Sequence, residues 1–174
     1  MAVDPLTLQD IPLLRTVALL TPPFASLTYA VPDWLAGFAW CPGLRVAVPL
    51  GRGMLRIGVV LGDGSPLPEG VTARPMLWPL EKEPLLPPGH MEMVRQLALR
   101  QAVTPGQILA MVLPAGLRVT QMRLRTMEGQ GKAQIRLLKD LPKLPVEVLS
   151  ALGEAWMRGG ADLLGTRYVA DSSG

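Results

Sequence analysis

Hydrophobic residues alternate with polar or small ones on both sides of a short glycine-bearing segment, residues 51–53. The alternating apolar residues are Leu44, Val46 and Val48 before this segment and Leu55, Ile57 and Val59 after it. A period of two on both sides of a turn predicts a β-hairpin with one buried face. The turn and the other face carry Arg45, Arg52 and Arg56 and no acidic residue. This combination predicts a small barrel with a basic rim that grips an anion.

Three further segments around the hairpin predict short strands. Residues 16–20 and 26–31 are apolar or alternating, and a Thr-Pro-Pro sequence separates them. Residues 71–80 are extended in character, but Pro75 and Pro79 restrict them to an edge position. Four or five short strands within about 65 residues favour a small antiparallel barrel, as in OB-like folds.

The pattern changes to a helical period after Pro84. Apolar residues recur at helical spacing between Gly89 and Ala102. Thr104 then predicts an N-cap, followed by Pro105 at the first helical position and a stop at Pro114. We expect these two helices to pack on the barrel or to close one of its ends.

Residues 118–174 form the second predicted domain, after an OB-like domain over residues 1–117. A helix is predicted from Lys132, with Lys132, Arg136 and Lys139 on one face. A second helix is predicted from Pro145, and residues 163–169 resemble a short hairpin. Helices followed by a two-stranded wing predict a winged-helix domain. The predicted fold class is therefore mixed α+β: an OB-like barrel with two helices, then a winged helix.

Composition and charge narrow the class of protein. Hydrophobic residues make up 49% of the 174 residues, enough for a core, and the net charge is +3. Residues 118–139 hold six basic side chains and one acidic one, which fits either a polyanion partner or a solvated helix face. Because no apolar run reaches the roughly 18 residues of a membrane span and no signal peptide is evident, a cytoplasmic protein is expected.

The residue types of known catalytic and metal sites are scarce. A single cysteine and a single histidine argue against a disulfide or a zinc site. The phosphate-binding GxxxxGK[ST] motif is absent, so ATP hydrolysis and bound cofactors are not expected of this chain. A binding module is favoured, either for nucleic acid or as a protein-interaction adaptor with no nucleic-acid ligand. The basic segments favour nucleic acid.

Several pieces of residues 1–117 resemble the amino-terminal domain of the primosomal replication-restart helicase PriA. The pieces are TVALLTPPFASLTYAVP, PGLRVAVPLGRGMLRIGVV, LEKEPLL and TPGQILAMVLPAGL, in that order. The last contains the G-x-x-L-x-x-x-LP pattern of the family at Gly106, Leu109, Leu113 and Pro114. The resemblance implies a domain that captures the 3′ end of a nascent strand at a stalled fork, followed by a winged helix on the fork duplex.

Carried over by motif, the pocket for the 3′ end would contain Leu27, Thr28, Tyr29, Gly51 and Arg74. Thr28 and Leu27 stand where the family has aspartate and phenylalanine, and Arg74 stands for its lysine. Further DNA contacts are predicted at Arg45, Arg52, Arg56, Lys132, Arg136 and Lys139.

The resemblance also implies partners and a setting. It suggests forked or single-stranded DNA with a 3′ end, single-strand DNA-binding protein, primosome loading proteins and a location at the bacterial nucleoid. Full-length members are ATP-dependent 3′–5′ helicases with Walker motifs and zinc-binding cysteines, and these 174 residues contain neither feature.

Overall fold

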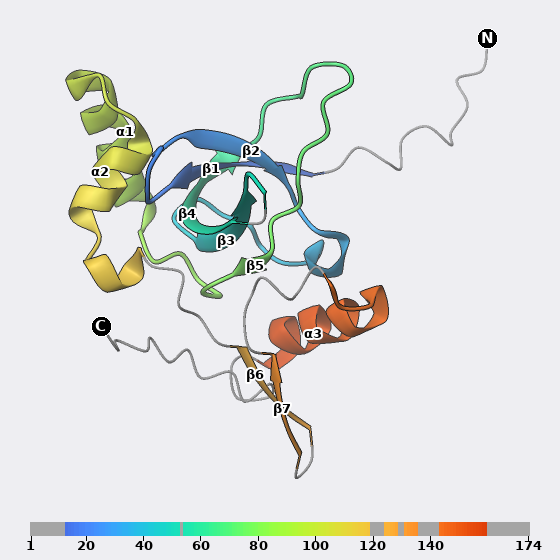
Figure 1. The fold of residues 1–174 in the computed structure, drawn as a ribbon. Helices are drawn as coiled ribbons and strands as arrows, with labels where there is room; N and C mark the ends of the chain where they lie inside the picture. The colour runs from blue at the N-terminus through green and yellow to red at the C-terminus, as the bar shows by residue number, and fades with distance from the viewer. Residues whose placement is uncertain (1–12, 53, 119–123, 129–130, 136–142, 160–174) are drawn as a thin grey trace.

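A computed structural model describes residues 13–52, 54–118, 124–128, 131–135 and 143–159 (Figure 1). Its main feature is a five-stranded sheet in the order β2-β1-β4-β3-β5, in which all neighbours are antiparallel. The strands are β1 (Leu14–Leu19), β2 (Ser26–Ala30), β3 (Arg45–Leu50), β4 (Met54–Asp63) and β5 (Trp78–Pro79). The predicted hairpin is confirmed as β3 and β4, and the two predicted strands before it as β1 and β2. The mixed α+β class is also confirmed.

The segment before β5 closes the sheet into a barrel. The backbone N–H of Ala30 in β2 donates to the carbonyl of Arg74 at 2.9 Å, and that of Met76 donates to the carbonyl of Ala30 at 2.9 Å. Two residues later, β5 pairs with β3. Residues 74–79 therefore join the outer edge of β2 to β3. Pro75 and Pro79 fit this peripheral position because a proline lacks the N–H that a central strand needs.

The core lies inside this barrel. Of the six residues whose alternation predicts a buried face, Leu55 is half-buried and packs against the core, and the others are fully buried: Leu44, Val46, Val48, Ile57 and Val59. Burial of each such side chain contributes about 1.5–3 kcal/mol to folding. The second face of the hairpin is covered in part as well, because Ala47 and Val60 are also inaccessible to solvent.

Helices α1 (Pro88–Gln101) and α2 (Pro105–Val112) lie together at one side of the barrel (Figure 1). Both helices and the N-cap were predicted correctly. The Thr104 hydroxyl accepts a hydrogen bond from the backbone N–H of Gln107 at 3.3 Å, and the Gln107 side chain accepts one from the N–H of Thr104 at 3.0 Å. This reciprocal capping box fixes the start of α2.

The chain after α2 passes through the short helix η3 (Ala115–Leu117) to a second, two-stranded sheet. Its strands are β6 (Leu124–Glu128) and β7 (Gly131–Ile135). The predicted helix from Lys132 is therefore wrong over residues 132–135. Those residues alternate between polar and apolar, and so short a segment fits either period. Residues 136–142 and the predicted wing at 163–169 lie outside the described residues, and the winged-helix assignment stays a prediction.

Helix α3 (Val146–Gly159) begins after Pro145, as predicted. Its neighbour is the short helix η2 (Asp33–Leu35), which follows β2. Leu149 and Leu152 of α3 belong to the same hydrophobic core as the barrel residues. A Cβ atom on Gly153 would collide with the Trp34 carbonyl, so the absence of a side chain allows this close contact. The predicted domain boundary after residue 117 stays a prediction.

Within the described parts of the chain, no helix is both long enough and apolar enough to span a membrane.

Candidate functional site

An open cavity of about 390 Å³ lies where three separate parts of the barrel meet. These parts are the first residues of β2, the end of β3 with its turn, and the loop that leads to the closing segment (Figure 1). The lining residues are Ser26, Leu27, Thr28, Tyr29, Pro49, Leu50, Gly51, Leu67, Val71, Thr72, Ala73 and Arg74.

The cavity brings together all five residues that the resemblance assigns to one pocket: Leu27, Thr28, Tyr29, Gly51 and Arg74. Sequence reasoning missed the remaining lining residues. Ser26, Leu50 and Ala73 each adjoin a predicted position in the sequence, so the sequence could have indicated that they lie near the pocket. Leu67 comes from a glycine- and proline-rich loop, whose composition gives no sign of which side chain turns inward.

Tyr29 lines the cavity, but its aromatic ring is buried rather than exposed to a ligand. Its side chain is only 3% exposed, and its hydroxyl donates to the carbonyl of Pro49 at 3.0 Å. This bond holds β2 to the end of β3. Burial raises the pKa of the Tyr29 hydroxyl above its ordinary 10.0, and the nearby Arg74 charge acts in the opposite direction. The hydroxyl is therefore neutral at physiological pH.

Arg74 stands at the exposed rim and is tied to the β3–β4 turn. Its Nη1 donates to the carbonyl of Gly51. Gly51 has a φ of +55°, and a Cβ there would meet only the Met54 methyl, at 3.7 Å. Glycine is thus favoured here by the left-handed backbone rather than by lack of space. Among the described residues Arg74 makes only this hydrogen bond, so its other guanidinium N–H groups are available for a phosphate.

Thr28 and Leu27 supply half-buried side chains to the wall formed by β2. The Thr28 methyl lies beside Gly64, where an added Cβ would come within 2.8 Å of it. The Thr28 hydroxyl makes no hydrogen bond within the described residues. It is therefore available to a ligand, as a donor or as an acceptor.

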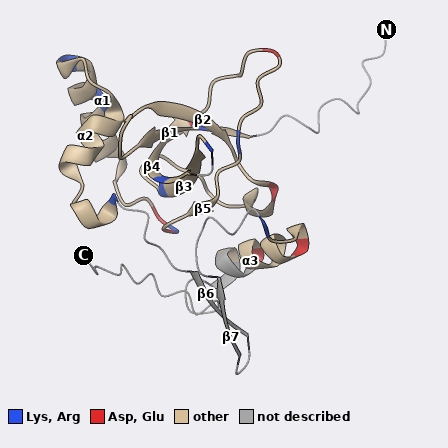
Figure 2. Ribbon diagram, in the orientation of Figure 1, with Lys and Arg blue, Asp and Glu red and all other residues tan. Residues whose placement is uncertain are grey.

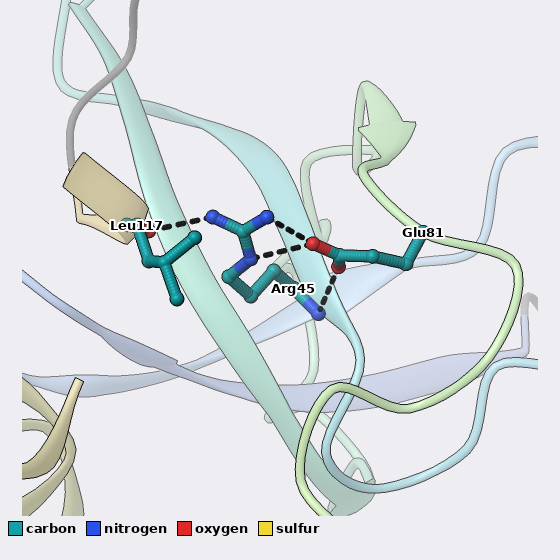
Figure 3. Close-up of polar contacts among 3 residues, drawn as sticks. All are labelled: Arg45, Glu81 and Leu117. Carbon is teal, nitrogen blue, oxygen red and sulfur yellow. Dashed lines mark hydrogen bonds and ion pairs between the residues drawn. The ribbon is translucent and has the colours of Figure 1, made fainter. Parts of the chain in front are cut away.

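Arg45 takes part in an internal network rather than standing free on a basic rim (Figure 3). Its Nε donates to Glu81 Oε1 at 2.7 Å, and its Nη2 donates to the same oxygen. Its Nη1 donates to the carbonyl of Leu117 at 2.8 Å, and its side chain is only 13% exposed. The network ties β3 to the segment after β5 and to the end of η3. The predicted basic rim is therefore wrong at Arg45, which is largely buried and paired with Glu81.

The other predicted contacts lie in different places. Arg52 is exposed in the β3–β4 turn, beside the cavity but not among its lining residues. Arg56 is half-buried in β4 and donates to the carbonyl of Leu55 at 3.1 Å. Lys132 lies on β7, whereas Arg136 and Lys139 are outside the described residues. Figure 2 shows the described basic residues on separate elements rather than in one continuous stripe.

The arrangement suits noncovalent binding of an anionic ligand with an apolar part. Leucine, valine and proline side chains make the walls, and hydroxyl groups and one guanidinium supply the polar contacts. No cluster of three or more histidine, cysteine or acidic side chains that could hold a metal ion occurs among the described residues. The site has the composition of a binding cavity.

A small closed β-barrel flanked by two helices, with a cation-rimmed cavity at its edge, is a binding domain of the kind that holds nucleic acids. Residues 16–114 match the sequence model of a family described as the 3′ DNA-binding domain (3′BD) of PriA, and the chain belongs to this family. The matched region begins at the third residue of β1, runs past the end of α2 and includes all five pocket residues. No curated protein matches the chain. The family implies DNA binding in replication restart.

Proposed function

We propose that the chain recognises stalled or branched replication forks by holding the 3′ end of the nascent strand in the cavity between β2, the β3–β4 turn and Arg74. Residues 118–174 would contact the duplex of the fork. Of the three basic residues predicted to make this contact, Lys132 lies in the described part of the chain, on β7. Single-strand DNA-binding protein and primosome loading proteins at the bacterial nucleoid are the proposed partners. In a full-length protein of this family, the region would be the DNA-binding part of a helicase.

The meeting of the five motif-derived residues in one cavity supports this proposal best. The cavity volume is near the lower end of the roughly 300–1,000 Å³ found for ligand sites, which suits a single nucleotide rather than a duplex. Its aliphatic walls can cover a base or a sugar, while Arg74 is placed to contact a backbone phosphate. The end of a strand fits such a site because a terminal nucleotide is joined to the chain on one side only. It can enter the cavity without carrying a neighbouring nucleotide in on its other side.

A binding titration with two forks tests the proposal. The forks are identical, but in one the nascent strand ends in a free 3′ end and in the other a covalent loop closes that end. We expect tighter binding of the open fork and a steep loss of affinity with salt for both. Equal affinity for the two forks would exclude end capture and leave general DNA binding. No binding of either, with salt-insensitive binding to a protein partner, would favour an adaptor.

Binding measurements on two arginine variants test whether the 3′ end of the strand lies beside Arg74. Arg74→Gln is expected to weaken open-fork binding by on the order of 1 kcal/mol and to leave closed-fork binding unchanged. Arg52→Gln is the matched control, because Arg52 lies in the β3–β4 turn next to Gly51 but outside the cavity. It should weaken both forks equally if Arg52 contacts the backbone. A similar loss on both forks for Arg74→Gln would remove Arg74 from the end pocket.

A further inference from the structure

We propose that the cavity accepts a strand end carrying a terminal phosphate at least as well as one ending in a free hydroxyl. This inference rests on the proposed capture of a DNA end and specifies the chemistry of the end. It comes from the charges that line the cavity. Arg74 is the only charged residue among the twelve described residues of the lining, and none of the twelve is acidic.

Asp63 and Glu69, the acidic residues close to the lining in sequence, lie outside the lining itself. Asp63, at the end of β4, forms an ion pair with Arg15 at 2.8 Å. Glu69 belongs to the loop between Leu67 and Val71, but it is exposed and is not among the lining residues. A terminal phosphate monoester, with a charge of about −1.5 to −2 at neutral pH, therefore meets one cation and no carboxylate in the cavity.

The hydroxyl groups of the lining do not discriminate between the two kinds of end. Thr28, Thr72 and Ser26 can each donate to a phosphate oxygen or accept from a sugar hydroxyl. An ionised carboxylate in their place would only accept, so it would select a hydroxyl end and repel a phosphate. The cavity also has room at its rim, because Gly51, Val71 and Arg74 are all exposed to solvent.

The test compares three otherwise identical forks whose nascent strand ends in a 3′-hydroxyl, in a 3′-phosphate or in a covalently closed loop. Fluorescence anisotropy with the full chain gives the three dissociation constants. We expect the phosphate end to bind from equally to about fivefold more tightly than the hydroxyl end, the range for a partly exposed ion pair. Phosphate binding measurably weaker than hydroxyl binding, with the closed fork weaker still, would overturn this inference and leave end capture intact. A closed fork that binds as tightly as both open forks would overturn both proposals.

A pair of Thr28 variants tests the electrostatic reason. Thr28→Asp places a carboxylate beside the proposed terminus, and Thr28→Asn is a neutral control of nearly the same size. We expect Thr28→Asp to bind the phosphate end about fivefold less tightly than the hydroxyl end, while Thr28→Asn keeps the wild-type ratio. Circular dichroism establishes that both variants fold. An unchanged ratio in folded Thr28→Asp would show that the terminus does not lie beside Thr28 and would overturn the inference.

Discussion

Tyr29 shows how one buried hydroxyl supports the cavity. Its bond to the Pro49 carbonyl joins two strands at the cavity wall. Tyr29→Phe removes this bond but keeps the ring, so we expect a loss of about 1 kcal/mol in the free energy of unfolding at neutral pH. Urea unfolding followed by circular dichroism measures the loss. An unchanged stability would mean that the hydroxyl bonds equally well to water.

The pH dependence of the same variant provides a second measurement. Because burial raises the folded-state pKa of Tyr29 above 10.0, the folded protein holds this proton more tightly than the unfolded chain does. The contribution is present below pH 10 and is lost as the pH rises through the folded-state pKa. The stability difference between wild type and Tyr29→Phe should therefore shrink above pH 10. A constant difference there would contradict the assigned pKa shift.

Arg45 illustrates why charge could not be placed from the sequence. Residues 44–60 of the hairpin contain no acidic residue, and this favoured a basic rim. Glu81, the partner of Arg45, lies 36 residues away and is brought close by the return of the chain alongside β3. Alternation identified the buried face of the hairpin correctly, but it carries no information about a contact so distant in sequence.

Helices α1 and α2 both begin with proline followed by glycine, yet the two glycines have different surroundings. A Cβ on Gly89 of α1 would meet nothing within 4 Å, whereas one on Gly106 of α2 would collide with the Leu19 carbonyl of β1 and lie 2.6 Å from the Phe24 carbonyl. We expect Gly106→Ala to destabilise the protein by about 1–3 kcal/mol and Gly89→Ala to stabilise it by about 0.5 kcal/mol. Thermal unfolding of both variants checks this. Equal effects would show that α2 can move away from β1 at no cost.

Local signals explain which elements the sequence predicts well. The start of α2 has a capping residue, a proline and a glutamine at the correct spacing, all within four residues. Residues 132–135 have no such signal, and the pairing of Lys132 with Met127 across the second sheet decides their conformation. The alternation in β7 is short enough to have been taken for part of a helix.

The cavity itself depends on the whole barrel. Its residues come from three stretches that meet only because residues 74–79 close the sheet. Alternation and composition predict the strands but not their curvature, so they cannot place Arg74 beside Gly51. The resemblance to known proteins could do so, because it relates positions that function together. Leu67 is part of no motif, and its place in the lining became evident only from the fold.

Helix α3 is the last described element of the chain and shares a hydrophobic core with the barrel. Substitutions at two adjacent residues of α3 can test this shared core. Leu149 is 3% exposed and belongs to the common core, whereas Val148 is 42% exposed. We expect Leu149→Ala to lower the free energy of unfolding by about 2–4 kcal/mol and Val148→Ala to change it by less than about 0.5 kcal/mol. Since α3 shares its core with the barrel, urea unfolding should show one transition by circular dichroism and by tryptophan fluorescence, and Leu149→Ala should shift both signals together. Two transitions, with only one moved by Leu149→Ala, would show that α3 unfolds independently of the barrel.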